Sequence, residues 1–195
     1  MKKIILNLGC GRTRIPDSLG VDIRKIGTYV DIVHDLDLLP YPFNNNSVNE
    51  IHMYHVLEHV HEPLKKMEEL YRILKLGGLV YLRVPHFSSM GAFSDITHIR
   101  PFGYTSFGVL EEEDYHHFYN KAKFKIIHNE IKYFGLYPNT GLYSKYIHKN
   151  SCPWYVRPIV RIINFLIKLS PPFFERFWCY WVGGATEVVV TLKKV

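Results

Sequence analysis

The chain has 195 residues, of which 47% are hydrophobic, and a formal net charge of +6 at pH 7. This size and composition predict one globular domain over residues 1–195 and exclude a low-complexity chain. No run reaches the roughly 18 uncharged apolar residues of a membrane-spanning helix. The first apolar strand starts too early to leave room for a signal peptide, and the three cysteines lack metal-site or disulfide spacing, so we expect a cytoplasmic protein.

The first two predicted strands enclose a glycine turn. Apolar residues at Ile4–Leu8 predict a buried strand over 3–8, which Gly9-Cys10-Gly11 follows. Glycines lack a Cβ, so the backbone can turn sharply there and approach a ligand closely. The next strand, over 18–23, carries Asp22 near its end. A glycine turn after one strand and an acid at the tip of the next are typical of nucleoside sites, where the acid accepts hydrogen bonds from the ribose hydroxyls.

Two common nucleotide motifs do not fit this region. A dinucleotide fingerprint needs G-x-G-x-x-G, but Arg14 stands at the third glycine and the acid comes earlier than about 20 residues on. No phosphate-binding G-x-x-x-x-G-K-[ST] occurs. The segment between Gly11 and Val21 is too short for a full helix and contains Pro16, so we expect a loop or a single helical turn. Without that helix dipole, Arg12 or Arg14 is the predicted source of positive charge for a ligand carboxylate.

The remaining elements alternate in the manner of an α/β fold. Apolar runs predict strands over 30–34, 49–54, 79–84, 124–133 and 186–192. Apolar residues at helical spacing predict a helix over 62–75 that Gly77-Gly78 ends, and another over Pro158–Leu169. Segments near 87–120 and 137–185 are irregular and are predicted to be inserts that cover an acceptor pocket.

Three segments in this order resemble one enzyme family. They are Leu6-Asn7-Leu8-Gly9-Cys10-Gly11, Val56-Leu57-Glu58-His59 and Arg72-Ile73-Leu74-Lys75-Leu76-Gly77-Gly78. Together they resemble the class I S-adenosylmethionine-dependent methyltransferases, in the type 11-like branch, over roughly residues 4–86. The resemblance implies a Rossmann-like sheet of seven strands, mostly parallel with an antiparallel last strand and helices on both faces. It also implies S-adenosyl-L-methionine as the cofactor.

The resemblance further implies which residues hold the cofactor. The methionine end of the cofactor is expected over the backbone N–H groups of Gly9, Cys10 and Gly11, which are expected to have no other hydrogen-bond partner. The ribose hydroxyls are expected to bind Asp22. Asp35 is expected near the adenine amine, Leu36 against the ring, and the backbone of His55 near the amino group. The full expected set is Asn7, Gly9, Cys10, Gly11, Asp22, Ile23, Asp35, Leu36 and His55. Asn7 stands where many relatives have an acid, so we expect it to brace the turn by hydrogen bonds.

An oxygen acceptor must lose a proton during methyl transfer, and histidine suits that role near neutral pH. The predicted base is His98, oriented by Asp95 three residues earlier, with His86 as the other candidate at a strand end. The alternative role for this region is a loop braced by ion pairs. Although His86, Asp95 and His98 are suitable metal ligands, their spacing matches no strong motif, so no metal is predicted.

The expected activity is O-methylation of a small-molecule, glycan or lipid-linked acceptor. One alternative is an RNA- or nucleotide-modifying enzyme, since residues 121–176 hold 10 Lys/Arg and two acidic residues. No N-P-P-Y-like segment follows the fourth strand, which disfavours nucleic-acid bases as acceptors. The other alternative is a non-catalytic cofactor-binding module. The aromatic, basic segment 154–181 is interpreted as a cover for the sheet, a homodimer contact or a membrane-surface element.

Overall fold

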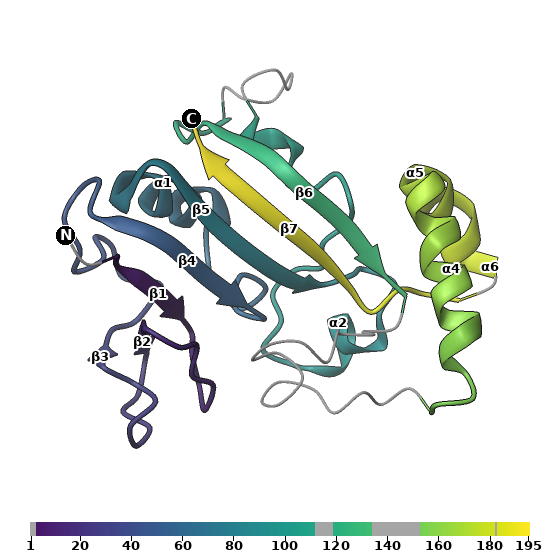
Figure 1. Ribbon diagram of the computed structural model, residues 1–195, viewed down its shortest axis with the longest axis horizontal. Coiled ribbons are helices and arrows are strands. Elements are labelled where there is room, and N and C mark those ends of the chain that lie inside the picture. Colours follow the sequence, from purple (N-terminus) through teal and green to yellow (C-terminus); the bar gives the residue numbers. More distant parts are fainter. Residues whose placement is uncertain (1–2, 112–118, 134–152, 182) are drawn as a thin grey trace.

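The computed structural model describes residues 3–111, 119–133, 153–181 and 183–195. In these residues seven strands form one sheet in the order β3-β2-β1-β4-β5-β7-β6 (Figure 1). The strands are β1 (Ile5–Leu8), β2 (Ser18–Asp22), β3 (Ile32–Val33), β4 (Val48–Tyr54), β5 (Leu74–Pro85), β6 (Phe124–Lys132) and β7 (Glu187–Lys194). β7 runs antiparallel to both of its neighbours, whereas the pairs from β3 to β5 are parallel. The predicted mostly parallel sheet with an antiparallel last strand is confirmed.

The helices gather after β4. They are α1 (Pro63–Ile73), α2 (Met90–Ser94), the short η1 (Gly108–Leu110), α4 (Arg157–Leu169), α5 (Pro171–Phe173), the π-helical η3 (Phe174–Trp178) and α6 (Cys179–Trp181). α1 packs on one face of the sheet, while α4 contacts the edge strand β6 (Figure 1). No helix lies between β1 and β4 in this part of the described chain, so the loop predicted after Gly11 is confirmed. Among the described helices, none is long and apolar enough to cross a bilayer.

The junction between α1 and β5 differs from the prediction. α1 ends at Ile73, and β5 begins at once with the buried Leu74. Gly77 and Gly78, which were expected to follow the helix as its stop, lie inside β5, where the pairing with β4 shifts from Val48↔Leu74 to Glu50↔Leu79. Gly77 has a φ of 76°, which favours glycine. The glycine pair therefore forms a bulge in the strand.

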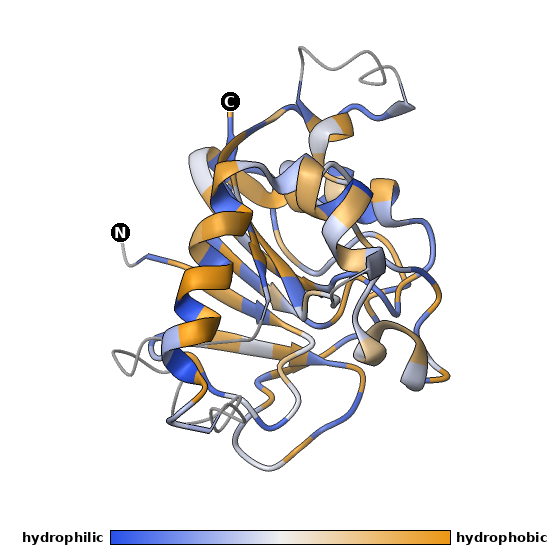
Figure 2. Cartoon of the chain, turned by 90° about the vertical axis from the view of Figure 1, so that its right-hand side faces the viewer, coloured by the Kyte–Doolittle hydropathy of each residue, from blue (hydrophilic) through white to orange (hydrophobic). Residues whose placement is uncertain are grey.

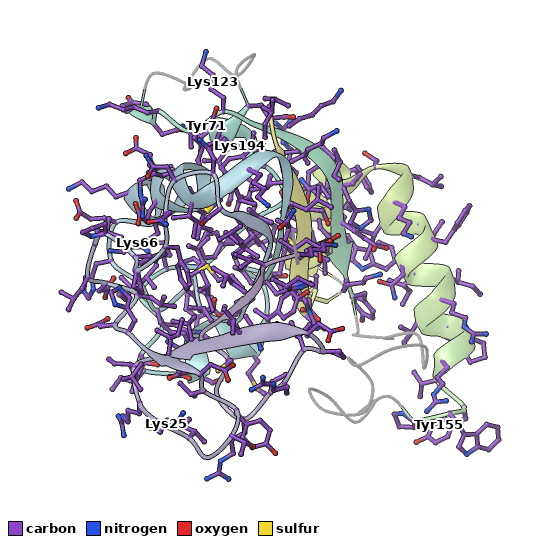
Figure 3. The ribbon with its side chains drawn as sticks, turned by 60° about the vertical axis from the view of Figure 1, so that its left-hand side comes forward. Lys25, Lys66, Tyr71, Lys123, Tyr155 and Lys194 are labelled. Atoms are coloured by element: carbon purple, nitrogen blue, oxygen red, sulfur yellow. The ribbon has the colours of Figure 1, made fainter. Side chains whose placement is uncertain are left out.

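Buried side chains join α1 to the sheet. Met67, Leu70 and Ile73 of α1 belong to the main hydrophobic core, together with apolar residues of β1, β4, β5 and β7. The Lys194 ammonium at the end of β7 donates to the carbonyl oxygens of Tyr71 and Leu74 at 2.6 and 2.8 Å. Lys194 and Tyr71 lie together at the end of α1 (Figure 3). A lysine there satisfies carbonyls that the helix leaves unpaired and favours the negative end of its dipole.

The sheet carries aromatic and polar side chains on the face that His52 occupies. The His52 ring stacks on Tyr81 with centroids 4.7 Å apart, and its Nδ1 lies 2.6 Å from the Tyr54 hydroxyl. Burial lowers the pKa of His52 to about 4, against a smaller opposing effect of Glu50. His52 is therefore neutral in the folded protein where an unfolded chain would already be protonated.

This difference predicts a pH-dependent stability. Because the folded pKa lies below the unfolded value of about 6.5, His52 stabilises the protein fully above that pH and loses its contribution as the pH falls toward 4. We expect the loss of unfolding free energy between pH 7 and pH 5, measured by urea denaturation, to be smaller in His52→Gln by about 1–2 kcal/mol. His128→Gln, at a side chain that is half exposed, is the control and should retain the wild-type loss.

Candidate functional site

An open cavity of about 320 Å³ lies at the carboxyl ends of β1, β2 and β4. Parallel α/β sheets bind ligands at this edge, and the volume suits a nucleoside. Its lining comes from the end of β2 and from the segments that follow β1, β2, β3 and β4. The lining residues are Gly9, Asp22, Ile23, Asp35, Leu36, Asp37, His55, Val56, His59 and Val60. Gly9, Asp22, Ile23, Asp35, Leu36 and His55 of the predicted cofactor set are thus brought together.

The glycine turn is tightly fixed. Gly9 has a φ of 64°, and a Cβ built there would lie 2.3 Å from a Val56 methyl carbon, so a larger residue would clash. The Cys10 N–H donates to the Val21 carbonyl at 3.1 Å, and the Gly11 N–H donates to the Asp22 carboxylate at 2.7 Å. The expectation of bare N–H groups is therefore wrong for Cys10 and Gly11, because the neighbouring strand already uses them.

Side chains around the turn have supporting roles. Asn7 is buried and donates to the Thr13 carbonyl oxygen at 3.0 Å, which is the brace that the sequence predicted. Arg14 pairs with Asp31 at 3.1 Å and is thereby drawn away from a ligand role, while Arg12 is exposed. Burial, with a smaller effect of Asp22, raises the pKa of the Cys10 thiol to about 11, so this thiol is a poor nucleophile.

Three acidic residues lie in the cavity wall. Asp22 ends β2, and its Oδ2 already accepts from Gly11, which leaves further lone pairs for a ligand. Asp35 accepts the Asp37 N–H at 2.9 Å, so a short turn holds both. Asp37 also receives hydrogen bonds from the backbone and ring of His61, both at 2.8 Å. Asp37 was not among the residues predicted from the sequence, although its place two residues after Asp35 was a usable signal.

Buried charges lie behind the cavity. His55, at the end of β4 with a φ of 54°, has its Nδ1 3.5 Å from Glu58 and its Nε2 3.6 Å from Glu187. Glu187 of β7 also accepts two hydrogen bonds of 2.6 Å from Arg83 of β5. Burial alone would lower the pKa of His55, but Glu187 and Glu58 outweigh it and raise that pKa to about 9. The sequence placed only the backbone of His55 at the site and missed this network.

The predicted pair of His98 and Asp95 lies beside the cavity. The His98 ring meets the cavity-lining His59 edge-on, with centroids 4.6 Å apart, and its Nε2 is 3.8 Å from Asp95. The Thr97 hydroxyl donates a hydrogen bond of 2.7 Å to the Asp95 carboxylate. The same hydroxyl oxygen lies 2.9 Å from His59 Nδ1. The place of His59 in the cavity wall was not predicted from the sequence.

His86 lies elsewhere. It is fully buried, with Nδ1 2.6 Å from the Ser88 hydroxyl and Nε2 3.0 Å from Glu175 of η3. These contacts tie the end of β5 to η3, and His86 is not part of the cavity lining. Of the predicted acceptor-pocket inserts, residues 112–118, 137–152 and 182 lie outside the described residues. So do Cys152 and residues 134–152 of the basic segment 121–176.

Comparison with known proteins agrees with this geometry. Residues 6–82, which hold the glycine turn, Asp22 and β1 to most of β5, match the family model of a methyltransferase domain. The chain has the fold of S-adenosylmethionine-dependent methyltransferases. No curated protein matches the sequence. The domain assignment therefore rests on the family model and on the fold.

Solved structures share this fold at low sequence identity. An S-adenosylmethionine-dependent methyltransferase from Archaeoglobus fulgidus is 17% identical, with a TM-score of 0.56 over 98% of this chain and 86% of that chain. One from Mesorhizobium loti is 15% identical, with a TM-score of 0.52 over 97% and 90%. The [4+2]-cyclase SpnF, at 15% identity, has a TM-score of 0.54 over 98% and 74%. The fold thus accommodates more than one chemistry.

The buried pair of Arg83 and Glu187 predicts a large effect on stability. Glu187→Gln would leave Arg83 buried with an uncompensated charge and would remove a partner of His55. We expect the free energy of unfolding in urea to fall by about 3 kcal/mol. The control is Glu62→Gln, since Glu62 and Lys65 are both 60% exposed, and it should cost less than about 1 kcal/mol. Equal losses for the two variants would contradict this role of the buried pair.

Proposed function

We propose that this protein transfers the methyl group of S-adenosylmethionine to an oxygen atom of a small-molecule, glycan or lipid-linked acceptor. The observation that carries the proposal is the cavity at the edge of the sheet, where a fixed glycine turn, the Asp22 carboxylate and two further acids face one space. The family match over the same residues supports it.

The residues present fit the parts of the cofactor. Asp22 has lone pairs left for the two ribose hydroxyls after its bond to Gly11. Asp35 and Asp37 supply acceptors for an adenine amine, and the side chains of Ile23, Leu36 and Val60 supply an apolar wall. The carboxylates also give the cavity a negative potential that suits a sulfonium cation. When bound, the cofactor supplies an electrophilic methyl group, and the chain itself must position the acceptor.

His59 and His98 are the residues that we assign to the acceptor. His59 lines the cavity and His98 packs against it, so an oxygen that approaches from this side meets an imidazole pair. The pair lowers the cost of removing the proton of the acceptor hydroxyl, and Asp95 and Thr97 orient it. This retains the role predicted for His98 and Asp95 and adds His59. His86, held between Ser88 and Glu175, is assigned a positioning role at the end of β5.

The cofactor contact predicts a specific loss of affinity. We expect Asp22→Asn to weaken binding of S-adenosylhomocysteine, measured by calorimetry, by at least about tenfold, because a charged hydrogen-bond acceptor is lost. Asp17→Asn, at an exposed loop position before β2, is the matched control and should bind like the wild type. Absent binding by the wild-type protein, or wild-type affinity in Asp22→Asn, would overturn the proposal. Binding without turnover on any acceptor would instead favour a non-catalytic module.

A further inference from the structure

A buried carboxylate next to the cavity lacks hydrogen bonds. Glu58 is fully buried, and neither of its carboxylate oxygens has a hydrogen-bond partner in the part of the chain that the structure describes. Buried carboxylates are normally hydrogen-bonded, paired with cations or bound to metals. The nearest ring nitrogens to its Oε1 are His55 Nδ1 at 3.5 Å and His98 Nε2 at 3.9 Å. Since His55 also faces Glu187, it does not serve Glu58 alone.

We propose that Glu58, His59 and His98 bind a divalent transition-metal ion beside the methyl-donor cavity. One ligand atom from each residue lies within 4.8 Å of those of the other two. An ion about 2.1 Å from each ligand atom needs these atoms roughly 3–4 Å apart, so small side-chain rotations complete the site. Two imidazoles and one carboxylate suit Zn²⁺, Mn²⁺ or Fe²⁺ and leave coordination positions open.

Neighbouring groups orient both imidazoles as in known metal sites. The Thr97 hydroxyl donates to Asp95, so it must accept its other hydrogen bond from His59 Nδ1–H. That contact makes Nε2 the basic nitrogen of the His59 ring. His98 Nδ1 lies 3.4 Å from the Ala92 carbonyl oxygen, which leaves its Nε2 toward Glu58. In known metal sites, the ring nitrogen of a histidine that does not bind the metal usually donates a hydrogen bond to a second group, which fixes the tautomer.

The function of the ion rests on the proposed methyl transfer. An acceptor hydroxyl at an open coordination position would lose its proton to solvent water more readily. Its oxygen would then form the new bond to the methyl carbon while the carbon–sulfur bond breaks and leaves its electron pair on sulfur. In this arrangement His98 acts on the acceptor as a metal ligand, with no need to take the proton itself.

The test measures metal binding without cofactor or acceptor. Protein stripped with a chelator is titrated with Mn²⁺ and with Zn²⁺ in a calorimeter. We expect one ion per chain, and at least about tenfold weaker binding in His98→Gln and in His59→Gln. His128→Gln, which removes a half-exposed histidine on β6, should bind like the wild type. Thermal unfolding of each variant verifies that it is folded. If one of the two histidine variants does not fold, the other still tests the site.

The possible results separate this inference from the proposed function. No ion bound by the wild type, or wild-type affinity in both His98→Gln and His59→Gln, would overturn the metal site. Asp22→Asn should still bind the ion while it loses S-adenosylhomocysteine. A protein that binds the nucleoside but no ion would refute the inference alone, whereas one that binds the ion but no nucleoside would refute only the proposed function.

A second inference rests on an independent feature, the bare side of α4. Val160 and Ile167 of α4 are buried, and Ile167 packs against Ile131 of β6. On another side of the same helix, five large apolar side chains are 49–67% exposed, and Figure 2 shows the hydrophobic stretch of this helix. They are Ile159, Ile162, Phe165, Leu166 and Leu169. The apolar side chains of α4 extend well beyond the buried Val160 and Ile167, so this helix needs a second apolar environment.

The surroundings of this exposed face favour a lipid surface. Exposed aromatic residues lie before and after α4, namely Trp154, Tyr155, Tyr180 and Trp181, and Tyr155 projects away from the body of the protein (Figure 3). Arg161 and Arg176 are exposed, while Glu175, the only acid in 153–181, is turned toward His86. An apolar groove of about 270 Å³, lined in part by Leu166, Leu169 and Phe173, opens on this side.

We propose that the face formed by α4 and residues 170–181 docks on an anionic membrane surface. Cations beside exposed apolar and aromatic residues match anionic lipid headgroups above an acyl layer. A symmetric dimer through this face would instead bring the arginines of two copies toward each other. Membrane docking would bring the cavity close to lipid-linked acceptors, which is one of the acceptor classes in the proposed function. Binding of the cofactor does not require it.

Vesicle sedimentation tests this docking. We expect the protein to sediment with vesicles that contain phosphatidylglycerol, less so at high salt, and poorly with phosphatidylcholine alone. Phe165→Glu and Leu169→Glu, at exposed positions, should each abolish sedimentation, whereas Leu76→Glu, 78% exposed on β5, should not. No sedimentation of the wild type, or equal sedimentation of all variants, would overturn the proposal. A dimer in analytical ultracentrifugation that Phe165→Glu dissociates, without vesicle binding, would identify a second copy as the occupant.

Discussion

The organisation of the site depends on the balance of charges behind the cavity. Glu58 and Glu187 are buried carboxylates from different parts of the chain, and Arg83 and His55 are the cations that face them. Such charges are costly to bury unless their partners are held in place. The pairing of Glu187 with Arg83 and His55 therefore fixes the ends of β4, β5 and β7 relative to one another. This arrangement therefore positions the floor of the cavity and the turn that carries His59.

The cofactor side of the cavity is built with little helical support. The described residues between β1 and β4 contain loops where a doubly wound fold would place crossover helices. Hydrogen bonds replace those helices: Asn7 holds the Thr13 carbonyl, Asp31 accepts the Gly20 N–H at 2.8 Å, and Asp22 accepts the Gly11 N–H. The same bonds occupy N–H groups that a ligand would otherwise use. In the proposed function, recognition of the nucleoside would therefore rest on carboxylates more than on a helix dipole.

The acceptor side is assembled from a different part of the fold. Residues 95–98 come from the segment after β5 and meet the turn after β4, where Ile99 N–H also donates to the Glu58 carbonyl oxygen at 2.8 Å. Beyond them, Glu175 of η3 contacts His86 and so ties η3 to the end of β5. The proposed donor binding, acceptor activation and surface docking would thus use separate groups of residues.

The sequence alone determined the parts of this protein that depend on neighbours along the chain. The strands, the main helices, the glycine turn and the place of Asp22 follow from periodicity and from local backbone limits, so they could be predicted. The boundary at Leu74 could not, since burial of that side chain against β4 overrides the glycine signal a few residues later. Only the tertiary structure decided that Glu58 and His59 meet His98, that Glu187 meets His55, and that the Cys10 and Gly11 N–H groups are already used. These contacts join residues far apart in sequence, and strand register and side-chain packing, which no local pattern encodes, set their distances.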